Sequence, residues 1–459
     1  MRNWLLAVAV LLSLASTAPA AATQIDISND KAVVEFPDRV TFSAELQSDT
    51  EIARVILEYG VVNQLTCGEV VAKAFPDITP GKRLAASWTW EMKQSGSEPP
   101  GAELWWQWRI VDSAGNEQVT DRQTAAWLDQ EHKWKTLTGG SINLHWYNGG
   151  QSFGKTLHDS AVSSLGELAD TTGLKPDSPI DLYIYANTDD MRDAVLYEPG
   201  WTGGLAYPDY NIVLIGIEPA QIDWGKQTQA HELTHVLVGH LTFSCLGNVP
   251  TWLNEGLAVY GEGGPDESSL RQLQEAIAGG TLASVRSLSG GFTEDSDRAN
   301  LSYSQSYSLV NFLIEEYGRD KMLDLLRALR DGETLDDAMH RLYGFDIEGF
   351  EDAWRAKIGA APRSAAEVAP TLTPTIVPTL VPVSGVPISP TLIPTQALST
   401  APPSPTLAQI LPTAIFGGDA NAPRTMFGGL AAICLSVVCI TSIIAVVAAF
   451  VARRRGTKP

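Results

Sequence analysis

The stretch HELTHVLVGH, residues 231–240, decides how this chain is interpreted, because it holds three of the seven histidines in 459 residues. His231 and His235 are four positions apart, so a helix would place both imidazoles on one face. Two imidazoles with that spacing can reach one zinc ion at about 2.1 Å. Glu232 leans to the neighbouring side, where it can hold a water molecule. The alternative is a helix whose histidines only cap or pack.

A third ligand would distinguish these two interpretations. His240 is unsuitable, because five further positions turn its side chain about 140° away from that of His235. Glu255 is better placed, in the stretch VPTWLNEGLAVY (249–260), where Pro250 suits the start of a second helix. The nineteen residues between His235 and Glu255 suit the return of a helix hairpin. Two histidines and one glutamate leave a fourth zinc position open to water, which is typical of catalytic sites. The alternative for Glu255 is a solvated helix carboxylate.

The sequence HExxH followed by WLNEG resembles the gluzincin metallopeptidases. It is most similar to the aminopeptidase N family and to the smaller peptidase-MA-like proteins of bacteria, over about residues 140–358. The resemblance implies that His231, His235 and Glu255 bind zinc. It also implies that Glu232 is the general base of a peptide hydrolysis.

The same resemblance implies a tyrosine that stabilises the oxyanion. Tyr303, in SYSQSYSLVNFLIEEYG (302–318), occupies the place of the family's Y-x-K-G tyrosine, and Tyr307 is the second candidate. Gln305 and Ser306 replace the lysine and glycine of that motif. The alternative for both tyrosines is packing in the protein interior.

Two departures from the family pattern bear on activity and on the support of the metal. Aminopeptidases of this group bind the substrate amine with a glutamate of a G-x-M-E-N motif, but the matching stretch TGGLAYPDYNIVLIG (202–216) has none beside Ala206. The sequence therefore favours an endopeptidase, whose edge strand can pair with an extended peptide.

Thermolysin-like proteins orient a ligand histidine with an aspartate four residues after the glutamate ligand. Val259 occupies that place, so the partner must come from elsewhere.

Residues 23–130 are predicted to form an all-β sandwich of the immunoglobulin or fibronectin kind. The stretches KAVVEF (31–36), RVTFSAEL (39–46), ARVILEYG (53–60) and ELWWQWRIVD (103–112) are short and rich in β-branched or aromatic residues. Five tryptophans in this part are expected to pack in the core rather than form a carbohydrate platform. They are Trp88, Trp90, Trp105, Trp106 and Trp108.

Residues 131–361 are predicted to form an α+β domain, which the resemblance makes zincin-like. SINLHWY (141–147), IDLYIYA (180–186) and NIVLIGI (211–217) have the composition of strands. After residue 225 the apolar residues recur with helical spacing, and glycines end several of the segments. Strands are therefore expected first and helices after them.

The two ends of the chain predict membrane anchoring. Residues 1–22 are typical of a secretory signal peptide, with Arg2, an apolar run and the small residues Ala18-Pro19-Ala20. Residues 362–425 alternate proline with threonine and predict an extended stalk. Residues 426–452 predict a single transmembrane helix, and the cationic tail 453–459 would stay cytoplasmic, leaving the body extracellular. Secretion permits a bond between Cys67 and Cys245, although two free thiols fit the sequence as well.

These features predict a membrane-anchored extracellular zinc peptidase that acts on peptide or protein substrates. The net charge of −21 argues against nucleic acid as a partner. Two alternatives remain open: a catalytically inactive surface binding protein that keeps the zincin-like fold, and a structural envelope protein in which the stalk and anchor are what matters.

Overall fold

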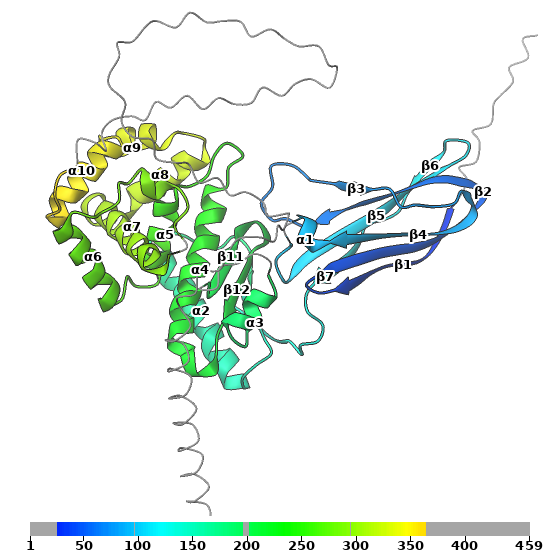
Figure 1. Ribbon diagram of the computed structural model, residues 1–459, viewed down its shortest axis with the longest axis horizontal. Helices are drawn as coiled ribbons and strands as arrows, with labels where there is room; N and C mark the ends of the chain where they lie inside the picture. Colours follow the sequence, from blue (N-terminus) through cyan, green and yellow to red (C-terminus); the bar gives the residue numbers. More distant parts are fainter. Residues whose placement is uncertain (1–24, 96, 196–201, 294, 364–459) are drawn as a thin grey trace, which may run out of the picture. The chain divides into compact units, whose positions relative to one another are not determined.

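The computed structural model describes residues 25–363, apart from residues 96, 196–201 and 294 (Figure 1). The predicted signal peptide, transmembrane helix and cytoplasmic tail, and all but the first two residues of the stalk, lie outside the described residues. No helix within the described ranges combines the length and the apolar character that a membrane span requires. The anchor and the extracellular location of the body therefore stay predictions.

The N-terminal part is all-β, as its β-branched and aromatic stretches predict. Its seven strands are hydrogen-bonded into a single sheet rather than two separate ones. The reason is β2 (Arg39–Val61), which joins two of the predicted strands into one. Its first half pairs with β1 and β4, its second half with β3 and β5, and an irregularity between Gln47 and Ile52 separates the halves. The other elements are β1 (Ile25–Glu35), β3 (Ala72–Ala74), β4 (Gly81–Glu91), the short α1 (Met92–Ser95), β5 (Ala102–Asp112), β6 (Glu117–Val119) and β7 (Gln123–Trp127).

The tryptophans of the N-terminal part mostly support the sheet, as expected. Trp106 and Trp108 are buried, and their indole Nε1–H groups donate to the same oxygen, Asp30 Oδ1, at 2.7 and 2.9 Å. Trp105 is buried beneath the guanidinium of Arg122. Trp90 is half-buried, and only Trp88 of the five is exposed. They therefore form no continuous exposed platform.

The C-terminal part contains a five-stranded mixed sheet in the order β11-β12-β10-β9-β8. The three central strands, which the sequence predicts, run parallel, and the edge strands β8 and β11 are antiparallel to their neighbours. Helix α2 follows β9 and packs on the same face of the sheet as α4. The strands are β8 (Lys135–Gly139), β9 (Ile142–Trp146), β10 (Ile180–Tyr185), β11 (Gly204–Tyr207) and β12 (Ile212–Gly216).

Helices make up most of the chain after residue 221, as the spacing of apolar residues predicts. Their buried faces share one core with the sheet, and α5 packs against both α4 and α7 (Figure 1). Aspartate or threonine side chains cap the N-termini of α6, α7, α9 and α10, which explains where these helices begin. The helices of this part are α2 (Gln151–Thr171), α3 (Thr188–Asp193), α4 (Ile222–Thr242), α5 (Thr251–Gly261), α6 (Glu267–Gly279), α7 (Ser296–Tyr317), α8 (Arg319–Arg330), α9 (Leu335–Tyr343) and α10 (Ile347–Ile358), with 3₁₀ turns η1 (Pro208–Tyr210), η2 (Pro219–Gln221) and η3 (Ser287–Ser289).

A disulfide joins Cys67 of the N-terminal part to Cys245, which follows α4. The sequence left the pairing of these cysteines open. The bond brings together residues 178 positions apart, between the loop after β2 and the connection from α4 to α5.

Candidate metal centre

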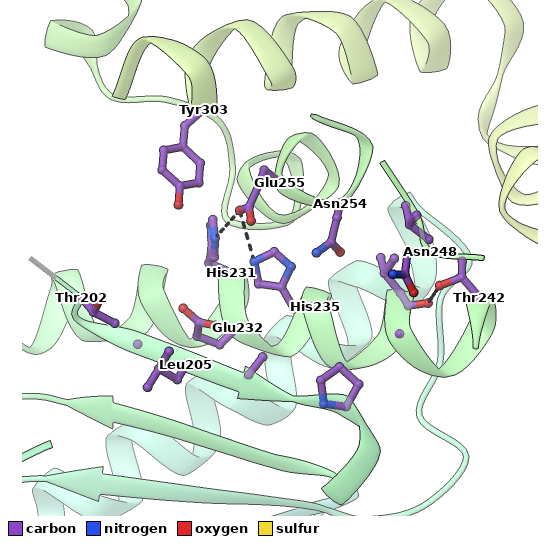
Figure 2. Close-up of a pocket in the computed structure, with 16 residues that line it drawn as sticks. Thr202, Leu205, His231, Glu232, His235, Thr242, Asn248, Asn254, Glu255 and Tyr303 are labelled. Atoms are coloured by element: carbon purple, nitrogen blue, oxygen red, sulfur yellow. Dashed lines mark hydrogen bonds and ion pairs between the residues drawn. The ribbon is translucent and has the colours of Figure 1, made fainter. Parts of the chain in front are cut away.

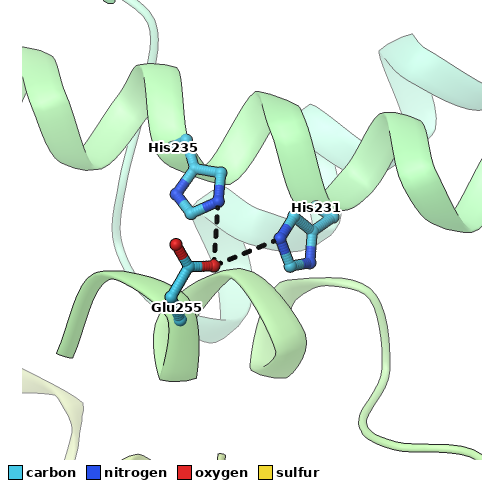
Figure 3. A group of neighbouring side chains, drawn as sticks. All are labelled: His231, His235 and Glu255. Carbon is cyan, nitrogen blue, oxygen red and sulfur yellow. Dashed lines mark ion pairs between the residues drawn. The ribbon is translucent and has the colours of Figure 1, made fainter. Parts of the chain in front are cut away.

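Helix α4 presents His231 and His235 on the face that looks toward α5. The opposite face is buried in the core through Leu233, Val236 and Leu237, which fixes the rotation of the helix about its axis. The two imidazoles point from successive turns of α4 toward Glu255 on α5 (Figure 3). Their side chains are largely shielded, with 16% and 13% of their surface exposed.

Helix α5 brings Glu255 against the two rings. It lies close to both neighbouring helices because two of its residues are glycines. A Cβ on Gly256 would press on the backbone carbonyl of Ser306 in α7, and one on Gly261 would press on Thr234 in α4. The sequence predicted the helix hairpin that returns Glu255 to α4, and the structure contains it.

The three side chains converge on one point. Glu255 Oε2 lies 3.5 Å from His231 Nε2 and 3.3 Å from His235 Nε2. One possible ligand atom from each residue lies within 4.8 Å of the others, and this is the single such group of three among the described residues. Glu255 Oε2 is buried and has no hydrogen-bond partner. A buried carboxylate oxygen facing two ring nitrogens fits a divalent cation with two histidine ligands and one glutamate ligand.

Electrostatics in the centre keep the carboxylate of Glu255 ionised. Burial alone would raise the pKa of Glu255, but His235 and His231 together hold it well below its usual range. Burial alone would lower the pKa of His231, whereas Glu255 and Glu262 raise it to about 10. The acidic groups thus attract positive charge strongly, whether it is carried by protons or by a metal ion.

Glu262 is the supporting residue that the sequence interpretation missed. Its Oε2 lies 3.4 Å from His231 Nδ1, on the side of the ring away from Glu255. Glu262 follows Glu255 by seven residues, or about two helical turns, so both carboxylates face α4. That spacing is the signal that could have identified it once Val259 failed as the partner. A carboxylate on the second ring nitrogen orients a ligand histidine and raises its basicity.

Glu232 lies apart from this group, beneath the edge strand β11. It is buried, and burial raises its pKa above the usual value for glutamate. Gly204 of β11 makes room for it, because a Cβ at that position would lie 2.6 Å from Glu232 Oε1. A glutamate with a raised pKa accepts a proton more readily than an ordinary one, which suits a general base.

A cavity of about 510 Å³ is lined by the side chains of four residues of the centre (Figure 2): His231, Glu232, His235 and Glu255. Its first wall is formed by Gly204, Leu205 and Ala206 of β11 and by Pro208 after it. Its second wall is formed by α4, the connection to α5 and α5 itself. The only carboxylates among its described lining residues are Glu232 and Glu255.

Tyr303 also lines the cavity, from α7. Figure 2 shows its hydroxyl directed toward Glu255 and His231, and its ring centroid lies 6.1 Å from that of His231. Burial, followed by the charges of Glu255 and Glu232, raises its pKa, so the hydroxyl keeps its proton. It is therefore available as a hydrogen-bond donor.

The two other candidates lie away from the centre. Tyr307 stacks on Tyr260 at 6.3 Å and is absent from the cavity lining. His240, on the last turn of α4, places its Nε2 3.2 Å from the carbonyl oxygen of Pro208 and takes no part in the group of three.

One protein family matches the part of the chain that contains the candidate metal centre. Residues 160–360 match the model of the Peptidase MA superfamily, a range that contains every residue of the centre. Among curated proteins no match was found. The family match covers less than half of the chain and supports a peptidase of the zincin-like kind.

Similar solved structures are distant. An M1 zinc metallopeptidase from Deinococcus radiodurans is 11% identical, with a TM-score of 0.30 over 74% of this chain and 93% of that one. Legionella pneumophila aminopeptidase A, in complex with aspartic acid, is 10% identical, with a TM-score of 0.31 over 69% and 47%. OgpA from Akkermansia muciniphila is 12% identical, with a TM-score of 0.20 over 24% and 29%. The chain thus spans less than a third of that OgpA structure, and scores this low carry no conclusion about fold or activity.

Proposed function

We propose that this protein is a zinc-dependent endopeptidase. The observation that carries the proposal is the convergence of His231, His235 and Glu255 in a cavity that also holds Glu232 and Tyr303. Zinc bound by the first three residues would supply an activated water and polarise the carbonyl of the scissile peptide. The match to the Peptidase MA superfamily supports the same reaction class.

The remaining residues of the cavity have separate tasks. Glu232 takes the proton of the attacking water and delivers it to the leaving amine, for which its raised pKa suits it. Tyr303 donates a hydrogen bond to the carbonyl oxygen as negative charge develops there. Glu262 holds the ring of His231 in the orientation that directs Nε2 toward Glu255.

The edge strand β11 is proposed to align the substrate. Among the described residues it pairs with β12 alone, and its residues Gly204, Leu205 and Ala206 line the cavity. An extended peptide can add to such an edge by backbone hydrogen bonds. The described lining residues offer no further carboxylate for a substrate amine, which favours cleavage within a chain over removal of its first residue.

We also propose that the body is extracellular and held at a membrane by the predicted helix 426–452. The disulfide between Cys67 and Cys245 supports an oxidising compartment, because such bonds are rare in the cytosol. The apolar C-terminal run and the three arginines that follow it support the orientation.

The test compares the full chain with its Glu232→Gln variant and, as a control, with Glu267→Gln, whose carboxylate is exposed on α6. Zinc content is measured by metal analysis and turnover with fluorescently labelled casein. We expect zinc in all three proteins and turnover in the parent and the control alone. Turnover by Glu232→Gln at the parent rate would show that the base is wrongly assigned. A zinc-loaded parent that cleaves neither casein nor a broad peptide library would favour the inactive surface binding protein.

A further inference from the structure

The loop of residues 62–68, here called the 62–68 loop, connects the N-terminal sheet to the domain that carries the metal centre. It follows β2 directly, and the N–H of Val62 donates to the carbonyl of Glu103 at 2.9 Å, which anchors the start of the loop to its own sheet. At its far end the Thr66 hydroxyl and Gly68 exchange hydrogen bonds of 2.6 and 3.1 Å. None of the roles proposed for the metal centre or for β11 involves a residue of this loop.

The loop is attached to the first wall of the cavity. The N–H groups of Gln64 and Leu65 donate to the carbonyl oxygen of Asp209, at 2.6 and 3.4 Å. Asp209 belongs to η1, immediately after Pro208, which lines the cavity at the end of β11. A further hydrogen bond of 2.6 Å, from the Tyr210 hydroxyl to Glu98, ties η1 to the N-terminal part.

The same loop is attached to the second wall by a covalent bond. Cys67 is joined to Cys245, three residues before Asn248, and both Asn248 and Val249 line the cavity. This connection between α4 and α5 has no regular secondary structure, and Cys245 itself is exposed. The disulfide therefore constrains the irregular connection of this wall, whereas the parts formed by α4 and α5 are held in the core.

Cys67 follows Gln64 by three positions and Leu65 by two, so the loop links the two walls of one cavity across a short span. Independent movement of either wall would break backbone hydrogen bonds at Asp209 or pull against the disulfide. The zinc ligands, in contrast, are held by α4 and α5 in the core and do not depend on the loop.

We propose that the 62–68 loop positions both walls of the cavity and thereby determines how tightly a polypeptide substrate binds, with Cys67 and Cys245 as positioning residues. This inference rests on the proposed peptidase function. It assigns the N-terminal domain a part in substrate binding, whereas the chemistry stays with the metal centre.

The test uses the full chain with Cys67→Ser and Cys245→Ser together. The control is Val70→Ser, which changes an exposed residue just beyond the loop and leaves both attachments in place. Hydrogen exchange is followed in three segments: 203–210 and 243–250, which contain the wall parts attached to the loop, and 229–237, which carries both histidines in the core helix α4. We expect exchange about tenfold faster in the two wall segments and unchanged in the third. Unchanged exchange in the two wall segments would overturn the proposal. Faster exchange in all three segments would also overturn it, because the disulfide would then stabilise the whole domain and not the walls in particular.

Substrate binding gives the second readout. The KM for labelled casein is expected to rise about fivefold in the double variant, while kcat and zinc content stay within about twofold. The reason is that the loop is proposed to contribute equally to binding of the substrate and of the transition state, so its loss weakens binding without slowing the chemical step. A fall in kcat at constant KM would overturn the positioning role. Binding of labelled casein is also measured in the Glu232→Gln background, where the expected weakening does not require turnover. Failure of the peptidase proposal is therefore distinguishable from failure of this one.

Discussion

The role of Glu262 gives the sharpest test of the metal centre. Substitution of Glu262 by glutamine removes its negative charge while keeping the size of the side chain and an amide oxygen beside His231 Nδ1. Loss of a supporting partner of a metal-binding histidine typically weakens metal affinity 10- to 100-fold. The separation of 3.4 Å is longer than the 2.7–2.9 Å of a strong charge-assisted hydrogen bond. We therefore expect the lower end of that range, about tenfold, or roughly 1.4 kcal/mol.

The assay is competition for zinc between the metal-free protein and a chromophoric chelator at neutral pH. Glu255→Gln serves as the upper reference, because it changes a proposed ligand and should lose far more affinity. Glu267→Gln is the lower reference, because its exposed carboxylate lies on the surface of α6. An affinity for Glu262→Gln equal to that of the parent would refute the supporting role. A loss as large as that of Glu255→Gln would mean that Glu262 binds the ion directly.

Three further changes probe the donor in the cavity, the packing of α5 and the charge balance of the N-terminal sheet. Tyr303→Phe should keep zinc and lower kcat on labelled casein by roughly 10²- to 10³-fold, as expected for loss of one oxyanion donor, and an unchanged kcat would assign Tyr303 to packing. Gly256→Ala should lower the free energy of unfolding in urea by about 1–3 kcal/mol, because its Cβ meets a backbone carbonyl of α7, whereas Gly166→Ala in α2 meets nothing and should not destabilise. Arg109 lowers the pKa of the buried Glu58 from 4.5 to about 2, so the unfolded chain binds more protons between these values and stability falls as the pH drops from 4.5 to 2. The loss is at most about 3 kcal/mol, reduced by screening at the partly exposed arginine, and Glu58→Gln should lack this slope in acid unfolding.

The site was predictable to the extent that it depends on local helix geometry. The four-residue spacing of His231 and His235 fixes their common face on any helix, and the downstream motif points to Glu255. The role of Glu262 was less accessible, because it depends on how far α5 continues and on which side of the His231 ring it passes. The rotation of Tyr303 toward the centre, as opposed to Tyr307, likewise depends on how α7 packs against α5.

The fold was predicted well in element type and less well in connectivity. RVTFSAEL and ARVILEYG were expected as separate short strands. The structure continues the backbone through the residues between them as β2 with an irregularity in its register. The pairing of Cys67 with Cys245 could not be predicted, because it depends on how two domains meet rather than on the sequence around either cysteine.

The passage of β2 through both halves of the N-terminal sheet has a consequence for how that domain denatures. Because β2 is the central strand of both halves, unfolding of one half would pull on the strand that holds the other half together. The two halves should therefore melt as one cooperative unit, with tryptophan fluorescence and far-ultraviolet dichroism reporting coincident transitions.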